Sequence, residues 1–395
     1  MTEPAPIPTT RPTGCPFDPP AGLTKLREEQ PLSPLAYPDG HVGRLATSHS
    51  LVRAVLSDPR FSARAELQHL PVPGASAQST PQPAPPGVFT QTDAPEHTRY
   101  RHLLTGQFTV RRMRLLTERI EEITLDHLDA MDEQGTSADL VRAFAVPIPA
   151  LVICELLGIP PIDRALFQRH AQALTELNST PEEKFGAYMA LRNLLLQLVI
   201  AKRAEPTDDL LGGLTTSDLT DEELTNIGFT LLGAGLDTTA NMLALGAFAL
   251  LSHPDQLSAL QEDPSAAVEE LLRYLSIIPF TVRAALEDVE LGGTLVKAGE
   301  VVTVSIPAAN RDPEHFDHPD ELDLRRAAGG HVAFGHGVHQ CLGQQLARIE
   351  MRVALPALFK RFPSLRLAIP AEKVPMRDDM LIYGVHELPV AWDAV

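Results

Sequence analysis

The longest apolar segment, residues 224–251, constrains the fold most, because so long a segment must be buried somewhere. Thr220 and Glu223 form a capping-box pattern that predicts a helix start, and His253-Pro254 predicts its end. About 20 apolar residues are enough to span a bilayer, but Asp237 and other polar residues interrupt this segment. We therefore predict a buried central helix, not a membrane span.

Composition supports a single soluble domain. The chain has 395 residues, 44% of them hydrophobic and 21% charged, and no Gly/Ser linker or long charge run divides its middle. We predict one domain over residues 21–395, preceded by a proline-rich segment over residues 1–20. That segment lacks the apolar core of a signal peptide or membrane anchor.

The net charge and the few cysteines indicate which cellular compartment and which classes of partner suit this protein. The formal net charge of −18 disfavours nucleic acids and anionic membranes as partners. Three scattered cysteines are too few for a disulfide framework, which fits a reducing cytoplasm. We expect a cytoplasmic protein without a membrane anchor, and a monomer.

A cysteine in a glycine-rich loop is the first chemical element. Residues 334–343 read FGHGVHQCLG, and Cys341 then opens a helix-patterned run whose start favours a thiolate. The glycines allow positive φ, so the sulfur can be aimed at a flat ligand. Two alternatives are a buried cysteine that acts as a small hydrophobe, and a zinc site with His331, His336 and His339. The chain has no Cys-x-x-Cys, and the spacing is unlike that of structural zinc.

Residues 334–343 resemble the haem-ligand loop FGxGxHxCLG of the cytochrome P450 superfamily at every fixed position. The resemblance implies that Cys341 binds the iron of haem b, within a loop framed by Phe334 and Gly343. Such a thiolate favours cleavage of the O–O bond. It also implies a mainly α fold with small β-sheets, in which the haem lies between the long central helix and the cysteine loop.

The central helix carries a second motif. Residues 234–239 read AGLDTT, similar to the family's oxygen-binding motif A-G-x-D-T-T. The resemblance implies that Ala234 and Gly235 leave room for O2 and let the helix open locally. Asp237 and Thr238 would then relay protons to the oxygen. The alternative is an ordinary threonine whose hydroxyl bonds back to the carbonyl of Ala234.

Glu270 and Arg273 form an E-x-x-R pair, which places both charges on one helix face. Alone, such a pair is most often a solvated surface pair. The resemblance implies a structural lock before the cysteine loop. Residues 316–326 look like the family's connecting meander, and the sequence does not decide whether Arg325 or Arg326 completes the lock.

Residues 95–101 resemble the family's P-E-H-x-x-x-R helix, in which His97 and Arg101 fall on one face. With Arg283 and His339, they would bind the two haem propionates, which need cationic or hydrogen-bonding partners. Each one alone could instead be a surface charge.

The substrate is the least determined feature. Residues 70–95 lack periodicity and predict a loop, which lids the pocket in the family, and residues 171–198 would move with it. Leu231, Ala234, Ile278 and Leu381 are candidate apolar walls, although each could be simple core. An apolar pocket excludes polar substrates without choosing among fatty acids, terpenoids, macrolides or aromatics.

The arginines suggest a partner surface on this acidic chain. The residues are Arg99, Arg111, Arg112, Arg114, Arg348 and Arg352. The resemblance implies a separate ferredoxin or flavodoxin with its reductase, and complementary charge would speed the encounter. Solvated helix faces are the alternative reading.

The whole resemblance implies a monooxygenase that inserts one atom of O2 into an apolar substrate, by hydroxylation or epoxidation, with electrons from NAD(P)H. Natural-product biosynthesis or xenobiotic oxidation is the expected setting. A peroxide-driven haem enzyme is one alternative, and it would not need Asp237 and Thr238. A non-catalytic haem sensor or carrier is the other.

Overall fold

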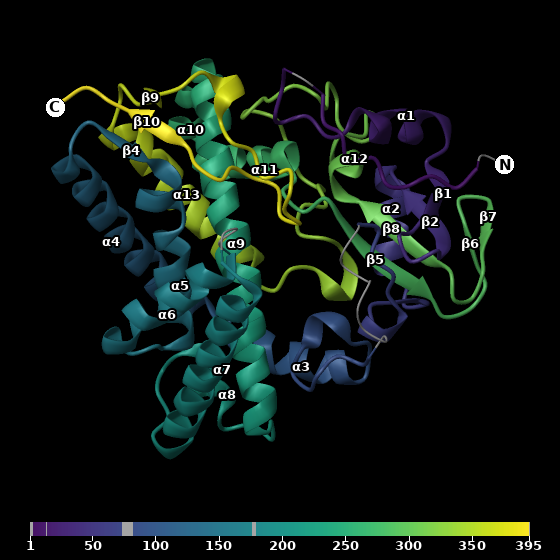
Figure 1. Ribbon diagram of the computed structural model, residues 1–395, viewed down its shortest axis with the longest axis horizontal. Helices are drawn as coiled ribbons and strands as arrows, with labels where there is room; N and C mark the ends of the chain where they lie inside the picture. Colours follow the sequence, from purple (N-terminus) through teal and green to yellow (C-terminus); the bar gives the residue numbers. More distant parts are fainter. Residues whose placement is uncertain (1–2, 13, 73–81, 176–178, 395) are drawn as a thin grey trace.

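A computed structural model describes residues 3–12, 14–72, 82–175 and 179–394 (Figure 1). The predicted central helix is α9 (Asp221–Ser252), which runs through the middle of the protein. The capping box is present, since the Thr220 hydroxyl accepts from the Glu223 N–H and the Glu223 carboxylate accepts from the Thr220 N–H at 2.7 Å. By length and composition α9 could cross a membrane, but most of its apolar stretch is buried inside the protein, as predicted.

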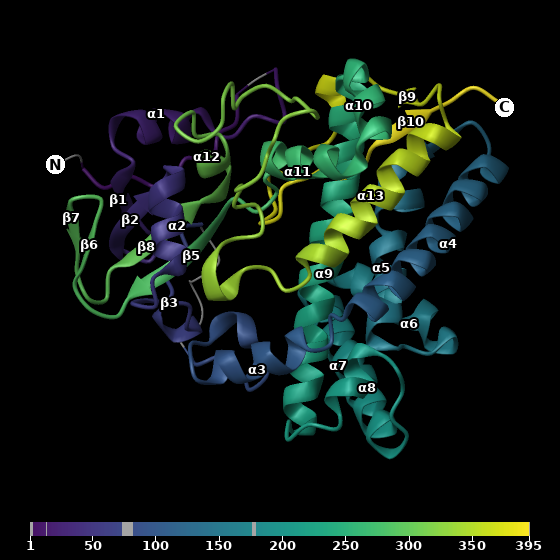
Figure 2. The ribbon, with the colours of Figure 1, turned by 180° about the vertical axis from the view of Figure 1, so that it is seen from behind.

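Helices surround α9 and form the larger lobe (Figures 1 and 2). Those in contact with it include α5 (Pro147–Leu157), α7 (Pro181–Ala204), α8 (Leu210–Leu214), α11 (Pro264–Leu275) and α13 (Gln344–Arg361). An outer group packs on them: α4 (Val110–Gln134), α6 (Pro161–Thr175) and α10 (Leu257–Glu262). Their apolar faces form one continuous core, so α9 is buried because other helices cover most of its surface.

The smaller lobe is built on a five-stranded sheet of order β1-β2-β8-β5-β3. Its strands are β1 (Leu32–Ala36), β2 (Val42–Ala46), β3 (Phe61–Ser62), β5 (Phe280–Ala285) and β8 (Val301–Ser305). Within this sheet, β2 and β8 pair in parallel, and the other neighbouring strands pair antiparallel. The helices of this lobe are α1 (Ala21–Glu29), α2 (His49–Ser57) and α12 (Ile306–Asn310).

Two small sheets complete the β-structure. One joins β4 (Ser137–Asp139), β10 (Pro389–Ala391) and β9 (Arg366–Leu367), and the other joins β6 (Val289–Leu291) and β7 (Thr294–Val296). Helix α3 (Glu96–Thr105) lies between the two lobes at one end (Figures 1 and 2). The predicted class, mainly α with small sheets, is confirmed.

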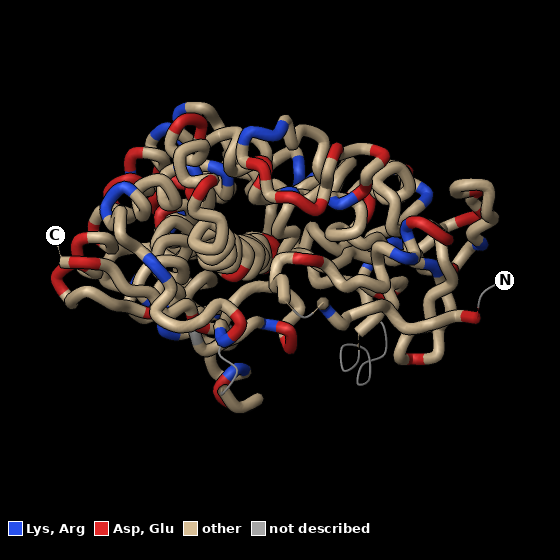
Figure 3. The backbone as a smooth tube through the Cα atoms, turned by 90° about the horizontal axis from the view of Figure 1, so that it is seen from above, with Lys and Arg blue, Asp and Glu red and all other residues tan. Residues whose placement is uncertain are grey.

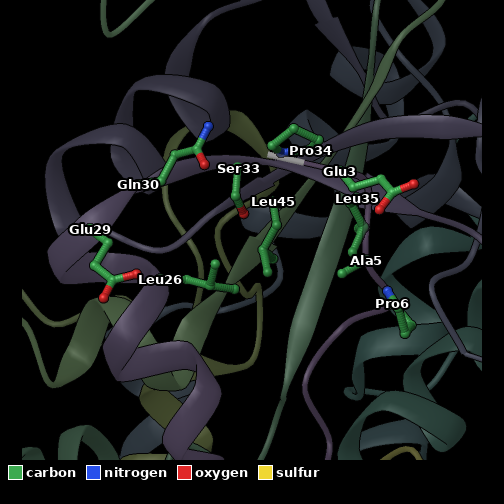
Figure 4. A pocket seen from close by; sticks show the side chains of 10 residues that line it. All are labelled: Glu3, Ala5, Pro6, Leu26, Glu29, Gln30, Ser33, Pro34, Leu35 and Leu45. Carbon is green, nitrogen blue, oxygen red and sulfur yellow. The ribbon is translucent and has the colours of Figure 1, made fainter. Parts of the chain in front are cut away.

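The N-terminal segment packs on the domain. Ala5 forms a parallel bridge with Leu35, and the Phe17 ring meets Phe248 of α9 edge-on at 5.0 Å. Between this segment, α1 and β1 lies a pocket of about 290 Å³ with an apolar floor that includes Leu26 and Leu45 (Figure 4). No residue of α9 or of the cysteine loop lines it. This pocket is therefore separate from the predicted chemistry.

Candidate functional site

One strip of α9 is uncovered. Gly233 and Ala234 are exposed, and Gly235, Asp237 and Thr238 are only partly buried, in a helix that is otherwise mostly covered. Residues four apart lie on the same helix face, so these positions share one side. A Cβ added at Gly233 would meet nothing within 4 Å. The middle of α9 therefore faces open space.

The cysteine loop lies beside this strip. In both ribbon views the first turn of α13 adjoins the middle of α9, and the two helices are in contact (Figures 1 and 2). Cys341 is exposed, and its N–H donates to the Phe334 carbonyl at 2.9 Å. Gly337 has φ +73°, and a Cβ there would collide with the carbonyl of Leu56, so only glycine fits. The loop thus presents its thiol on a fixed backbone.

The acidity of Cys341 differs from the expectation. Although the residue is exposed, the protein atoms around its sulfur desolvate the thiolate and raise the pKa of the thiol above its ordinary value, while the Gly343 N–H and the charges of Arg101 and Arg348 act in the opposite direction. The prediction of a thiolate favoured by the helix start is therefore wrong for the protein alone. A metal cation bound to the sulfur would instead lower the pKa of the thiol and favour the thiolate, because coordination deprotonates a thiol.

The zinc alternative is not supported. His331 binds Glu269 at 3.0 Å, His336 lies 3.4 Å from Arg53, and His339 packs on His97. The three rings therefore have separate partners. Over the described ranges of the chain, no group of three or more His, Cys, Asp or Glu side chains could hold a metal ion.

Four basic groups predicted to bind propionates lie together. The rings of His97 and His339 have centroids 4.0 Å apart, and the charge of Arg101 acts on both. Burial, with Arg101, lowers the pKa of His97 to about 4. Burial, with His97, Arg283 and Arg101, lowers the pKa of His339 to about 3. Both imidazoles are therefore neutral at physiological pH.

Among the residues that the structure describes, this cluster forms no ion pair, although the charge of Asp93 acts on His97 and Arg283. Arg283 is buried, burial lowers its pKa to about 10, and its hydrogen bonds go to Thr281 and the Val282 carbonyl. The Nε2 atom of His97 is buried with no hydrogen-bond partner. A buried cation and an orphaned ring nitrogen are both satisfied by an anion. The cluster therefore fits the carboxylates of a haem.

The two predicted relay residues lie next to each other on the uncovered strip. The Thr238 hydroxyl donates to the Ala234 carbonyl at 2.6 Å, which is the ordinary bond considered above. Asp237 accepts from Arg377 Nη1 at 2.8 Å and from Asn241 Nδ2 at 3.0 Å. The predicted local opening of the helix is wrong, since α9 is α-helical throughout. The Thr238 hydroxyl and the Asn241 amide each donate to a helix carbonyl four residues earlier, and the helix continues through both positions.

Glu270 and Arg273 are fully buried in α11, with N···O distances of 2.7 and 2.8 Å. Arg326 adds a third charge at 3.1 Å from Glu270, whereas Arg325 pairs with exposed Glu262. The choice that the sequence left open therefore falls on Arg326. Arg273 also donates to three backbone carbonyls, those of Asn310 and Pro319 at 2.8 Å each and that of Glu321 at 3.2 Å.

The candidate substrate residues come from three separate segments of the chain. Leu231 is buried in α9, Ile278 is partly buried after α11, and Leu381 is 56% exposed in the C-terminal loop. Part of the predicted lid, residues 73–81, and residues 176–178 of the predicted mobile region lie outside the described residues. Sequence reasoning missed Arg377, for which no local pattern gave a signal.

Most arginines of the predicted partner surface are paired. Basic and acidic segments lie side by side over much of the backbone (Figure 3). The pairs join Arg99 to Glu223, Arg111 and Arg112 to Asp208, Arg114 to Glu118, and Arg348 to Glu269. Arg352 forms no ion pair with any residue that the structure describes, and it bonds only to Ser265 and the Arg348 carbonyl.

Glu350 of α13 is a buried acid that sequence reasoning did not identify. Burial raises its pKa to about 8, and its Oε2 has no hydrogen-bond partner. Because the folded-state pKa of Glu350 lies above its ordinary value, the contribution of this group to the free energy of unfolding is fully present at low pH. That contribution is lost as pH rises toward 8. Glu350→Gln is expected to be more stable than the wild type by on the order of 4 kcal/mol at pH 8, and equal to it at pH 4. Urea unfolding at both pH values measures this, and an equal difference at both would contradict it.

Comparisons with known proteins agree with this geometry. The Cytochrome P450 family model matches residues 153–390. The chain is 52% identical over 398 residues to cytochrome P450 105C1 of a Streptomyces species, covering 99% of this chain and 100% of the relative. It is 43% identical to pentalenic acid synthase of Streptomyces avermitilis, with coverage of 99% and 100%.

Solved structures agree as well. The complex of Streptomyces peucetius CYP105P2 with a biphenyl compound superposes with a TM-score of 0.92 at 43% identity, covering 99% of this chain and 100% of the other. The complex of CYP105P1 with filipin I gives a TM-score of 0.91 at 42% identity, with full coverage of both chains.

Proposed function

Because the chain belongs to the cytochrome P450 family, we propose which of its residues carry out the haem-thiolate monooxygenase reaction of that family. The cofactor is haem b, which supplies the activation of O2 and its transfer to substrate when bound. The observation that carries the assignment is the open space beside α9, with exposed Cys341 and an unpaired basic cluster at its edges. Cys341 would hold the iron, and His97, Arg101, Arg283 and His339 would hold the propionates.

The protein's own groups supply position and protons. Ala234 and Gly235 keep side-chain bulk away from the oxygen side of the site, since a Cβ at Gly235 would meet only Ile153 at 3.4 Å. Asp237 and Thr238 would supply protons to the open space beside α9. The Thr238 hydroxyl holds the proton at its Oγ1, next to the uncovered strip.

Thr238→Ala tests this relay. The variant is expected to retain haem but to lose about tenfold in product formed per reducing equivalent, because general acid groups contribute 10²–10⁴-fold and Asp237 remains. The measurement is oxygen uptake, peroxide release and product with biphenyl and filipin I as probes. Thr230→Ala is the matched control, since Thr230 makes the same bond to a carbonyl, that of Asn226, two turns earlier.

An unchanged product yield in Thr238→Ala would contradict the relay. If wild type and variant both formed product with hydrogen peroxide and neither did with a reductase, the peroxide-driven alternative would hold instead. Haem binding without any oxidised product would indicate a sensor or carrier.

Substrates are apolar organic molecules of the natural-product or xenobiotic type. Relatives are named pentalenic acid synthase and nocardicin C N-oxygenase, and solved relatives bind filipin I and a biphenyl compound. Leu231, Ile278 and Leu381 would contact the substrate. Hydroxylation or epoxidation is the reaction.

The electron donor is a separate ferredoxin or flavodoxin with its NAD(P)H-dependent reductase. Since Arg348 is neutralised by Glu269, unpaired Arg352 on the same helix is the better contact for an acidic partner. Arg352→Ala is expected to raise the KM for a ferredoxin about threefold at low salt, and by less at 0.5 M salt, because screening removes the attraction.

Arg325→Ala is the control for that experiment, because Arg325 is an exposed arginine that is already paired. A KM that does not respond to salt, or an equal effect of both variants, would contradict a specific role for Arg352.

The protein functions as a cytoplasmic monomer with a single P450 domain over residues 21–395, and the described part of residues 1–20 packs on it. Burial of Phe17 supports this arrangement. The three cysteines are free thiols, which suits a reducing compartment.

A further inference from the structure

A buried arginine from the C-terminal loop contacts the relay acid. Arg377 donates to Asp237 through Nη1 at 2.8 Å and through Nη2 at 3.2 Å. These two parallel bonds fix the plane of the carboxylate. Asn241 adds a third bond, to Oδ1 at 3.0 Å. Both oxygens of Asp237 are therefore held in one orientation.

The loop that supplies Arg377 is anchored at its base. Met376 and Val385 form an antiparallel bridge, and the Arg377 N–H donates to the Gly384 carbonyl at 2.9 Å. The Tyr383 N–H donates to the Ile277 carbonyl at 2.9 Å, and the guanidinium of Arg11 lies 3.4 Å from the Tyr383 ring. The guanidinium of Arg377 therefore starts from a fixed backbone.

The same loop meets α9 directly. A Cβ added at Gly384 would collide with the amide oxygen of Asn241, so the backbone comes close to the helix at this point. The opposite end of the loop carries Leu381, which is 56% exposed. One short segment thus contacts the relay acid at its base and offers an apolar side chain at its tip.

Stability alone is a poor reason for this pair. Arg377 is 9% exposed, and its Nε has no hydrogen-bond partner. Removing buried Arg377 and partly buried Asp237 from water costs about as much as their attraction returns, so apolar residues would stabilise the contact equally well. What an apolar pair would not provide is a fixed orientation for the carboxylate next to Thr238.

We propose that Arg377 is a positioning residue for Asp237, so that the loop over residues 376–385 is part of the proton-delivery machinery. The proposal rests on the proposed relay role of Asp237. Arg377 does not itself donate to oxygen. It holds the carboxylate at the edge of the uncovered strip, where it can pass protons to Thr238.

The test compares Arg377→Met, Arg377→Lys, Asp237→Asn and the double variant Arg377→Met/Asp237→Asn as haem-loaded enzymes. Arg366→Met is the matched control, because Arg366 forms an exposed ion pair with Asp393 at 3.0 Å in the same part of the chain. Three quantities are measured with biphenyl and filipin I as probes: product per reducing equivalent, product driven by hydrogen peroxide, and the C–O stretching frequency of the reduced carbon monoxide complex.

Arg377→Met and Asp237→Asn are each expected to lower the yield per reducing equivalent about tenfold, with no further loss in the double variant, because a pair that acts as one unit is not additive. Peroxide-driven turnover should change less than about twofold, since peroxide already carries the protons. The C–O stretch should shift in Arg377→Met but not in Arg366→Met. Arg377→Lys should lie between Arg377→Met and the wild type, because lysine keeps the charge but not the two parallel bonds.

The outcomes separate the two ideas. A normal yield in Arg377→Met with a low yield in Asp237→Asn would overturn the role of Arg377 and leave the relay intact. An equal loss of reductase-driven and peroxide-driven turnover in Arg377→Met, with an unshifted C–O stretch, would reduce Arg377 to a structural clamp. A normal yield in Asp237→Asn would overturn the relay itself. If Arg377→Met does not fold, Arg377→Lys decides, and a wild-type yield and stretch in it overturn the proposal.

Discussion

Cys341→His is expected to abolish the strongly red-shifted Soret band of the reduced carbon monoxide complex and at least about 99% of monooxygenase turnover. Loss of an outer partner of a metal ligand already costs about 10–100-fold, and loss of the ligand itself costs more. The reason lies in the loop, where Gly335 and Gly337 adopt positive φ and Cys341 is exposed beside α9. The assay is the reduced, carbon-monoxide-bound absorption spectrum.

Cys154→Ala is the control for this prediction. Cys154 is buried in α5, and burial raises the pKa of its thiol to about 12, so it is an inert core residue. Its replacement should leave the spectrum unchanged. A red-shifted band that survives in Cys341→His, or that disappears in Cys154→Ala, would refute Cys341 as the ligand.

Glu270→Ala is expected to lower the free energy of unfolding of the haem-loaded protein by about 3–5 kcal/mol, because it leaves Arg273 buried without its counter-charge. Both side chains have 0% exposure. Urea denaturation, followed by far-UV circular dichroism and by Soret absorbance, measures the loss. Exposed Arg325→Ala should cost less than about 1 kcal/mol.

A double variant, Glu270→Leu/Arg273→Met, distinguishes the contribution of the ion pair from that of the hydrogen bonds between Arg273 and the backbone. If the pair mattered only as two opposite charges, the apolar pair would restore stability. We expect incomplete recovery, because Arg273 also satisfies the carbonyls of Asn310 and Pro319. A loss below about 1 kcal/mol in Glu270→Ala would contradict the lock.

Local patterns predicted the local features. The capping box at Thr220 and the apolar run after it were enough to identify α9, because both depend on neighbours in the sequence. Features that depend on distant partners were not predictable. The ion pair of Asp237 joins residues 140 apart, and the partners of Arg348 and Arg99 lie 79 and 124 residues away.

The sequence also could not predict whether Arg325 or Arg326 pairs with Glu270, although the two arginines are neighbours. Both follow Asp323, and both are charged and adjacent. Arg326 reaches Glu270 only because the backbone turns there, with the Arg326 N–H bonded to the Asp323 carbonyl at 2.9 Å. A difference of one position along the chain therefore decides which arginine pairs with Glu270, and amino-acid composition does not show which one it is.

The basic cluster at the end of the open space joins the two lobes. His97 comes from α3, Arg283 from strand β5 and His339 from the turn before α13, so three separate parts of the chain bring their donors to one point. Without an anion, folding concentrates positive charge there and leaves the His97 nitrogen unsatisfied. Haem uptake and closure of the contact between the lobes are therefore thermodynamically linked: the apoprotein should open first along this contact, and a protease should cut it there before the holoprotein.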